Sequence, residues 1–140
     1  MQVQAYLNFD GRTEEAIEFY RKAIGAEVQM LMRYKESPEP AQPGMVPPGS
    51  ENKVMHASFR VGDSMVMASD CHCKGAAKFD GISLSLTVDN PAQSEKCFGA
   101  LSAGGKVNMP LTKTFFSPSF GVVTDKFGVT WMIYVPGHQG

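Results

Sequence analysis

The chain has 140 residues, of which 43% are hydrophobic, and a formal net charge of -1. These values predict one compact domain or two small modules sharing a core, and the lack of a basic block argues against nucleic acid as a partner. No apolar run reaches the roughly 18 residues of a membrane span, so we expect no membrane partner. The N-terminus lacks the pattern of a secretory signal. Three cysteines, an odd number, argue against a secreted disulfide framework, so we expect a cytoplasmic protein.

Polar and apolar residues alternate strictly over residues 3–9, which predicts a strand. Its apolar side chains, from Val3 onward, are expected to pack on a helix. Its polar side chains, Gln4, Tyr6 and Asn8, then face water, a partner or a ligand.

A helix should follow, with Thr13 as its N-cap and Gly25 as its left-handed C-cap. Residues 27–35 are expected to form a second strand. Five prolines and two glycines within residues 37–50 exclude regular structure there, so we expect a long surface loop; a lid over a site is the alternative.

Two apolar runs at residues 54–61 and 64–69 predict a hairpin, with a tight turn and positive φ at Gly62. The composition of residues 70–80 is that of a linker. After it, residues 81–88 alternate as cleanly as the first strand did, with Ser83 and Ser85 on the polar side.

The second half of the chain repeats the first at an offset of 79 positions. Asn90 should cap a helix, with Gln93 completing a capping box and residues 104–105 ending the helix. Strands are then expected at residues 113–116 and in a hairpin over residues 120–134.

The predicted fold class is therefore α+β, with two βαβββ modules forming a concave mixed sheet that has helices on its outer face. We place the first module at residues 1–70, with a proline-rich loop at 37–53. A linker at 71–80, a second module at 81–136 and a short tail at 137–140 complete the chain.

Five stretches in order carry a family resemblance: YLNFDGRTEEAIEFYRKAIGAEV, KVMHASFRVGDSMVMASD, FDGISLSLTVDN, GGKVNMPLTKTFF and FGVVTDKFGVTWMIY. The chain resembles the vicinal-oxygen-chelate superfamily, also called the glyoxalase/bleomycin-resistance/dioxygenase fold. It is most similar to the PhnB-like branch, often labelled a 3-demethylubiquinone methyltransferase-like domain. The sequence has no Gly-rich turn followed by an acidic ribose-binding residue, which a nucleotide-derived cofactor would suggest.

The resemblance implies one divalent metal held by His and Glu on the first and last strands of each module. When the metal-ligand positions of the superfamily are transferred to this sequence, they fall near Gln4 and Met67 and at Ser83 and Met132. Thioethers and a serine hydroxyl do not suit a hard dication. We therefore predict no metal ligands at these positions and no cofactor, with a bound divalent metal as the alternative.

His56 is the histidine that lies inside a predicted strand, and imidazole suits general base catalysis near neutral pH. The alternative is a half-buried histidine bonded to backbone. We take His56 and Tyr6 as the candidate catalytic residues. Candidate ligand-binding residues are Gln4, Asn8, Met67, Ser83, Ser85, Phe116, Trp131 and Met132, although methionines and aromatics at such spacing also suit a plain core.

Asp70, Cys71, His72 and Cys73 place four potential metal ligands in one turn. Adjacent ligands rarely close a tetrahedron alone, so His138 or a second chain would have to complete such a site. Adventitious binding in an exposed loop is the simpler interpretation.

We expect a protein that binds a small molecule on its sheet. If the protein is an enzyme, we expect isomerisation, lyase chemistry or group transfer. A non-catalytic sequestration protein of the bleomycin-resistance type and a ligand-free structural dimer are the alternatives. The resemblance also implies a homodimer, because this fold commonly pairs modules from two chains.

Overall fold

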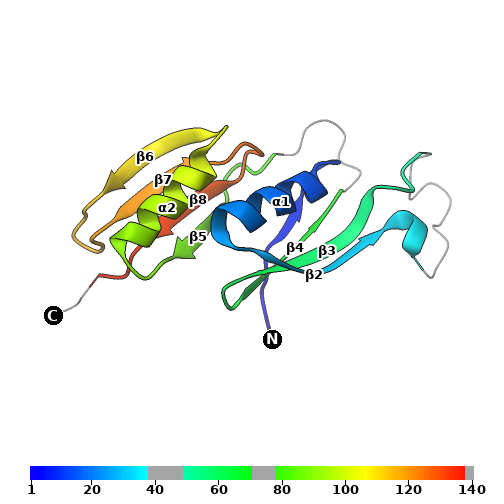
Figure 1. Ribbon diagram of the computed structural model, residues 1–140, viewed down its shortest axis with the longest axis horizontal. Helices are drawn as coiled ribbons and strands as arrows, with labels where there is room; N and C mark the ends of the chain where they lie inside the picture. Colours follow the sequence, from blue (N-terminus) through cyan, green and yellow to red (C-terminus); the bar gives the residue numbers. More distant parts are fainter. Residues whose placement is uncertain (38–48, 71–77, 138–140) are drawn as a thin grey trace. The chain divides into compact units, whose positions relative to one another are not determined.

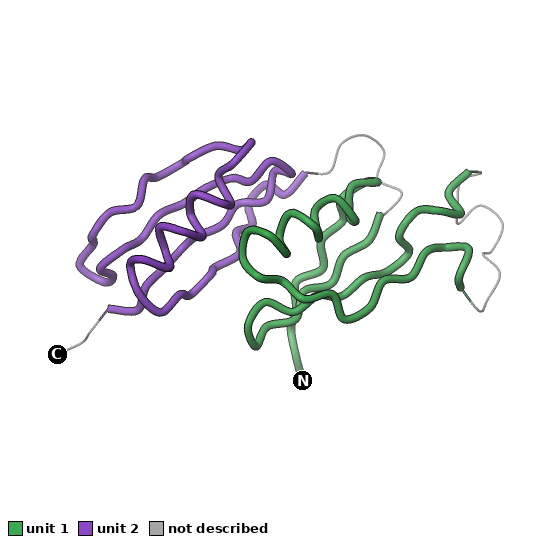
Figure 2. The backbone as a smooth tube through the Cα atoms, viewed as in Figure 1, with its two compact units in different colours: residues 1–77 green, residues 78–140 purple. Residues whose placement is uncertain are grey.

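The chain folds into two compact units, Met1–Ala77 and Lys78–Gly140, in the computed structural model (Figure 2). The structure describes residues 1–37, 49–70 and 78–137. Most of the proline-rich loop, the Cys71, His72 and Cys73 segment and His138 lie outside these residues. Among the described residues, no helix is long and apolar enough to cross a membrane.

Unit 1 is a βαβββ module in which α1 lies across one face of a four-stranded sheet (Figure 1). The strand order is β1-β4-β3-β2, with β1 and β4 parallel and the other pairs antiparallel. Its elements are β1 (Tyr6–Asn8), α1 (Thr13–Ile24), β2 (Glu27–Arg33), the 3-10 helix η1 (Tyr34–Glu36), β3 (Val54–Val61) and β4 (Ser64–Ser69).

Unit 2 repeats this plan, with strand order β5-β8-β7-β6 and a parallel β5–β8 pair. Its elements are β5 (Ser83–Thr87), α2 (Pro91–Ser102), β6 (Lys106–Thr112), β7 (Phe120–Thr124) and β8 (Thr130–Tyr134). The predicted α+β class with two βαβββ modules is confirmed.

Strand register shows how closely the two units correspond. Tyr6 pairs with Met67 in the first unit, and Ser85 pairs with Met132 at the equivalent place in the second. An irregularity in register falls between Val28 and Met30 in β2, and its equivalent in β6 falls between Val107 and Met109, again 79 positions later. A shared bulge is a specific feature of strand geometry, so it supports the internal repeat better than sequence identity does.

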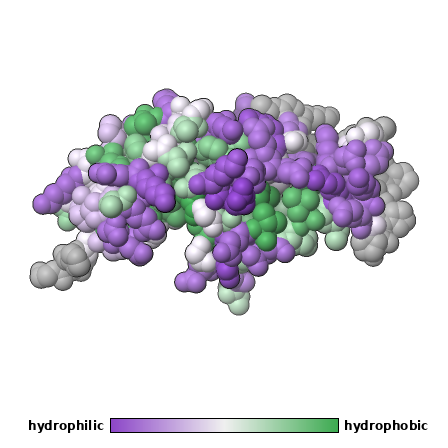
Figure 3. All heavy atoms as spheres, in the orientation of Figure 1, coloured by the Kyte–Doolittle hydropathy of each residue, from purple (hydrophilic) through white to green (hydrophobic). Residues whose placement is uncertain are grey.

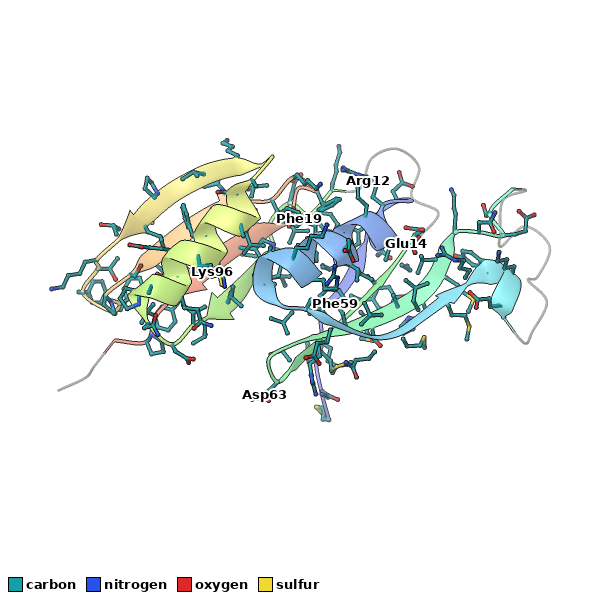
Figure 4. The ribbon with its side chains drawn as sticks, in the orientation of Figure 1. Arg12, Glu14, Phe19, Phe59, Asp63 and Lys96 are labelled. Carbon is teal, nitrogen blue, oxygen red and sulfur yellow. The ribbon has the colours of Figure 1, made fainter. Side chains whose placement is uncertain are left out.

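Each helix buries an apolar stripe on its own sheet. In unit 1 the ring of Tyr20, which is fully buried, stacks on Phe59 with centroids 5.9 Å apart (Figure 4 labels Phe59 beneath α1). In unit 2 a Cβ on Gly121 would lie 2.7 Å from a ring atom of Phe98, so glycine is what allows α2 to pack this closely on β7. The surface seen in Figure 3 is mainly hydrophilic over α1, as expected for an amphipathic helix.

Several predicted boundaries are wrong. β1 is limited to Tyr6–Asn8, and Val3 is 96% exposed instead of packing on the helix. The strand expected at residues 113–116 lies earlier, as β6 at Lys106–Thr112, and α2 already ends at Ser102.

The turn at Gly62 and the cap at Gly25 are confirmed by their positive φ angles of 57° and 71°.

The two helix N-termini are capped differently. Asn90 caps α2 as predicted, its side chain accepting from the Gln93 N–H, although Gln93 accepts from the Asp89 N–H instead of completing a box with Asn90. Thr13 is not the cap of α1, because it is the first helical residue and its buried hydroxyl finds no partner in the described part of the chain. The Thr13 N–H donates to the carboxylate of Asp70 instead.

Candidate functional site

The sheet face opposite α1 carries most of the predicted site residues of unit 1. We call it the helix-free face of unit 1, and cross-strand pairing arranges its side chains in rows. One row runs Tyr6, Met67, Ser58 and Met30 across all four strands, and two further pairs, Asn8 with Ser69 and His56 with Met32, lie beside it. The alternation of strand side chains explains why Leu7, Ala57, Phe59 and Ala68 are buried on the other side.

Tyr6 and His56 meet on this face. Tyr6 Oη lies 3.2 Å from His56 Nδ1, and the ring centroids are 5.6 Å apart. Tyr6 is 43% exposed and His56 is half-buried, so both can contact a molecule from solution. The pairing brings a hydroxyl and an imidazole together from strands 50 residues apart in sequence. This combination can donate and accept hydrogen bonds and exchange protons with a ligand.

Polar and thioether groups surround this pair. Ser69 donates a hydrogen bond to Asn8 Oδ1 at 3.0 Å, which fixes the amide of Asn8 beside the end of β4. Met67 is paired with Tyr6, and Met32 is paired with His56. Methionine side chains are adaptable, so they can line a binding surface without imposing one shape.

Sequence reasoning missed Tyr34, which follows β2 two positions after Met32. Its burial, with smaller effects from Tyr6 and Asp70, raises the pKa of the Tyr34 phenol above its ordinary value. The Tyr34 N–H donates to the Lys53 carbonyl oxygen at 3.1 Å, which places Tyr34 beside the residue that precedes β3. A register irregularity between Met32 and Arg33 interrupts the alternation of β2 just before Tyr34, so the strand pattern offered no signal for this residue.

Asp70 lies in a stretch that the sequence predicts to be a linker, yet its side chain is buried and hydrogen-bonded to the backbone. It is 4% exposed, and its two carboxylate oxygens accept from the Thr13 N–H and the Val54 N–H, each at 2.9 Å. The carboxylate therefore ties the end of β4 to the start of α1 and the start of β3. Of the four potential metal ligands at residues 70–73, Asp70 is the one that the structure describes, and both of its carboxylate oxygens accept backbone N–H groups.

In unit 2, the face opposite α2, here called the helix-free face of unit 2, carries Ser83, Ser85 and Thr87 in register with Thr130, Met132 and Tyr134. The Phe116 ring packs over this face, edge-on to Phe120 with centroids 5.1 Å apart and stacked on Tyr134 at 6.2 Å. Ser85 and Met132 are the counterparts of Tyr6 and Met67, and Phe120 is the counterpart of His56. This face therefore has hydroxyls and aromatic rings but no imidazole in the described residues.

Trp131 does not join these residues. It is 3% exposed and pairs with Leu84 and Val123, which places it on the side of the sheet that α2 covers. Its Nε1–H donates to Asp125 Oδ2 at 2.8 Å. The expectation that Trp131 and Met132 line one surface was wrong, because neighbouring strand residues point to opposite faces.

The positions at which the resemblance implies a divalent metal do not fit such an ion. Gln4 precedes β1 and is half-buried, while Met67, Ser83 and Met132 supply two thioethers and a hydroxyl. Among the described residues, no group of three or more His, Cys, Asp or Glu side chains could hold a metal. A hard dication requires carboxylate, imidazole or water ligands, so we route no chemistry through one.

A separate depression of about 510 Å³ lies in unit 2 at the N-terminus of α2. Thr87, Asn90, Pro118 and Pro136 are among its lining residues. None of the predicted site residues lines it, and the Asn90 side chain is already engaged in capping the helix.

Comparison with known proteins identifies relatives over almost the whole chain. The family model described as 3-demethylubiquinone-9 3-methyltransferase matches residues 1–134. The chain is 35% identical to protein YjdN of Escherichia coli (strain K12) over 144 residues, covering 99% of this chain and 98% of YjdN.

Solved structures agree with this match. Protein PA1353 from Pseudomonas aeruginosa has a TM-score of 0.83 at 39% identity, covering 97% of this chain and 98% of its own. A putative 3-demethylubiquinone-9 3-methyltransferase, PhnB protein, from Bacillus cereus has a TM-score of 0.79 at 29% identity, covering 96% and 99%. A glyoxalase-related enzyme from Fulvimarina pelagi shares the fold, with a TM-score of 0.63 at 16% identity and coverage of 96% and 88%.

Proposed function

Because the chain belongs to the 3-demethylubiquinone-9 3-methyltransferase family, in its PhnB-like, glyoxalase-related form, we propose that it binds a small molecule. The ligand is compact and partly aromatic or oxygenated. It binds on the helix-free face of unit 1, where Tyr6 and His56 make the polar contacts. Asn8 and Met67 contribute further contacts on the same face.

The contact between Tyr6 and His56 carries this proposal. Both side chains are polar, accessible and 3.2 Å apart on the face that the unit's helix leaves uncovered. A binding surface for a small molecule typically combines apolar walls with a few placed polar groups. The neighbouring methionines supply the apolar part here.

As an enzyme, the protein would act by isomerisation, lyase chemistry or group transfer. His56 would take a proton from the ligand, and Tyr6 would orient the imidazole and donate a hydrogen bond to a ligand oxygen. The sequence has no Gly-rich turn of the kind that binds nucleotide-derived cofactors, so the methyltransferase description of the family does not assign the reaction.

A non-catalytic sequestration protein of the bleomycin-resistance type is the second candidate. The chemistry of Met67, Ser83 and Met132 favours it, because binding a molecule without transforming it needs no Lewis acid. In this case Ser83, Ser85, Phe116 and Met132 of unit 2 form a second ligand-contacting surface. A ligand-free structural dimer remains the third candidate, and a ligand screen separates it from the other two.

The binding proposal is tested by a saturation-transfer NMR screen of small aromatic and oxygenated compounds. For compounds that bind, Tyr6→Phe and His56→Gln should each weaken affinity about three- to tenfold, the value of one lost hydrogen bond. Asp63→Ala, in the exposed turn between β3 and β4 and away from the proposed surface, is the control. Equal affinity for the wild type and both unit 1 variants would refute the proposed surface, and recovery of bound compounds unchanged would favour sequestration over catalysis.

We also propose that the protein is a cytoplasmic homodimer. The outer strands of both sheets expose matched apolar pairs, Val28 and Met30 at 45% and 42% and Val107 and Met109 at 45% and 43%. Apolar edge strands favour association unless they are protected. Sedimentation equilibrium at micromolar concentration should give twice the chain mass, and a monomer there would refute the dimer.

A further inference from the structure

Methionine thioethers lie around His56 on the helix-free face of unit 1. Met32 is directly opposite His56 on β2, and Met30 and Met67 are both paired with Ser58, two residues along β3 from His56. Directly paired side chains have Cβ atoms about 4.5–5.5 Å apart and diagonal ones about 7–8 Å. An imidazole and two or three long, flexible thioethers can therefore converge on a single atom.

The Tyr6 contact prepares His56 for this role. Tyr6 Oη lies 3.2 Å from Nδ1, so in the tautomer that carries its proton on Nδ1 the imidazole donates to Tyr6. This tautomer leaves Nε2 with a free lone pair. A metal-binding histidine commonly has its other ring nitrogen fixed by a hydrogen-bond partner in this way.

The donor atoms of these side chains determine which metal ion the site can bind. Thioether sulfur and imidazole nitrogen suit soft Cu(I) and exclude hard cations such as Mg²⁺ or Ca²⁺. The thioethers and a neutral imidazole carry no charge, and Arg60, a charged residue on the same face, is paired with Glu27 at 2.6 Å. We propose that His56, Met32 and the flanking Met30 and Met67 form a binding site for a soft monovalent cation, Cu(I), for which Ag(I) is the experimental equivalent. The site does not depend on the proposed small-molecule function.

The internal repeat supplies a control within the same chain. Met109 and Met132 occupy the positions in unit 2 that Met30 and Met67 occupy in unit 1. Phe120 stands where unit 1 has His56, and Thr112 stands where it has Met32. Unit 2 thus presents two thioethers on the same scaffold without the imidazole.

The test is a titration of methyl-¹³C-methionine protein with silver nitrate in chloride-free buffer. Thiols would compete for silver, so the full chain carries Cys71→Ser, Cys73→Ser and Cys97→Ala, with its native spectrum verified first. At one equivalent of Ag(I), the methyl signals of Met30, Met32 and Met67 should shift. The signals of Met65, Met109 and Met132 should stay in place.

Variants then test each part of the site. Tyr6→Phe should weaken Ag(I) binding about 10–100-fold, as expected for loss of a partner that orients a metal-bound histidine. His56→Gln should abolish the selective shifts, while Met65→Leu, on the same face beside Arg60, should leave them unchanged. Equal shifts of all methionine signals would show generic thioether affinity and overturn the site. An unshifted Met32 signal at saturating Ag(I), or binding that survives His56→Gln, would also overturn it.

Discussion

Replacing Asp70 gives the sharpest test of how unit 1 is held together. Its carboxylate accepts two backbone N–H groups at 2.9 Å from a position that is 4% exposed. A hydrogen bond to a charged group contributes about 1.5–3 kcal/mol to stability, and a buried donor left unpaired costs a similar amount. Because water can enter the space left by the carboxylate and recover part of this loss, Asp70→Ala should lower the free energy of unfolding by about 3 kcal/mol. Asp70→Asn keeps one acceptor oxygen, so it should cost roughly half as much.

Urea denaturation monitored by circular dichroism measures this change, and amide hydrogen exchange localises it. The Thr13 and Val54 amides should exchange faster in Asp70→Ala, beyond the change in global stability. Asp63→Ala is the control, because Asp63 lies exposed at the tip of the β3–β4 hairpin (Figure 4) and its loss should stay within about 0.5 kcal/mol. If Asp70→Ala also stayed within that range, the carboxylate would not be the clamp inferred here.

Three further predictions concern single groups that are buried or partly buried. Asp125 accepts from two backbone N–H groups and from Trp131 Nε1, so Asp125→Ala should cost about 3 kcal/mol and red-shift the emission of the single tryptophan; unchanged emission would contradict this. Burial raises the pKa of the Tyr34 phenol, so the folded state keeps a proton that the unfolded state loses, and stability should fall as the pH rises above the ordinary value of 10.0. Tyr34→Phe should reduce that alkaline loss measured by urea denaturation, and an identical pH profile would refute the assignment. Burial also raises the pKa of the Cys97 thiol, so in a chain with its other cysteines replaced, alkylation at pH 8 should be slow until urea unfolds the protein, and equally fast alkylation in the native state would disagree.

The repeated plan of the fold was predictable because it is encoded locally. Alternation gave the strands, Asn90 and Gly25 gave helix ends, and the offset of 79 positions linked the two units. β6 was misplaced because Pro110 and the polar residues around it weaken the strand pattern of an edge strand. The late start of β1 was also hidden, because the alternation begins at Val3 although the pairing with β4 in the described structure begins at Tyr6.

The candidate site was only partly predictable for a related reason. Tyr6 and His56 could each be singled out, yet their contact depends on the order β1-β4-β3-β2, which local sequence does not specify. Trp131 was misassigned by a single register step, and one step reverses the face of a strand residue. Asp70 looked like part of a loop because its two partners lie 57 and 16 residues away in the sequence.

We propose that Tyr6 and His56 act together on a bound molecule at the helix-free face of unit 1. A double-mutant cycle tests it most directly: the affinity of a screened ligand is measured for the wild type, Tyr6→Phe, His56→Gln and the double variant. If the two side chains act together, the affinity losses of the single variants should not add, with a coupling above about 0.5 kcal/mol, as found for residues in contact. Full additivity, or single variants that bind as tightly as the wild type, would contradict it.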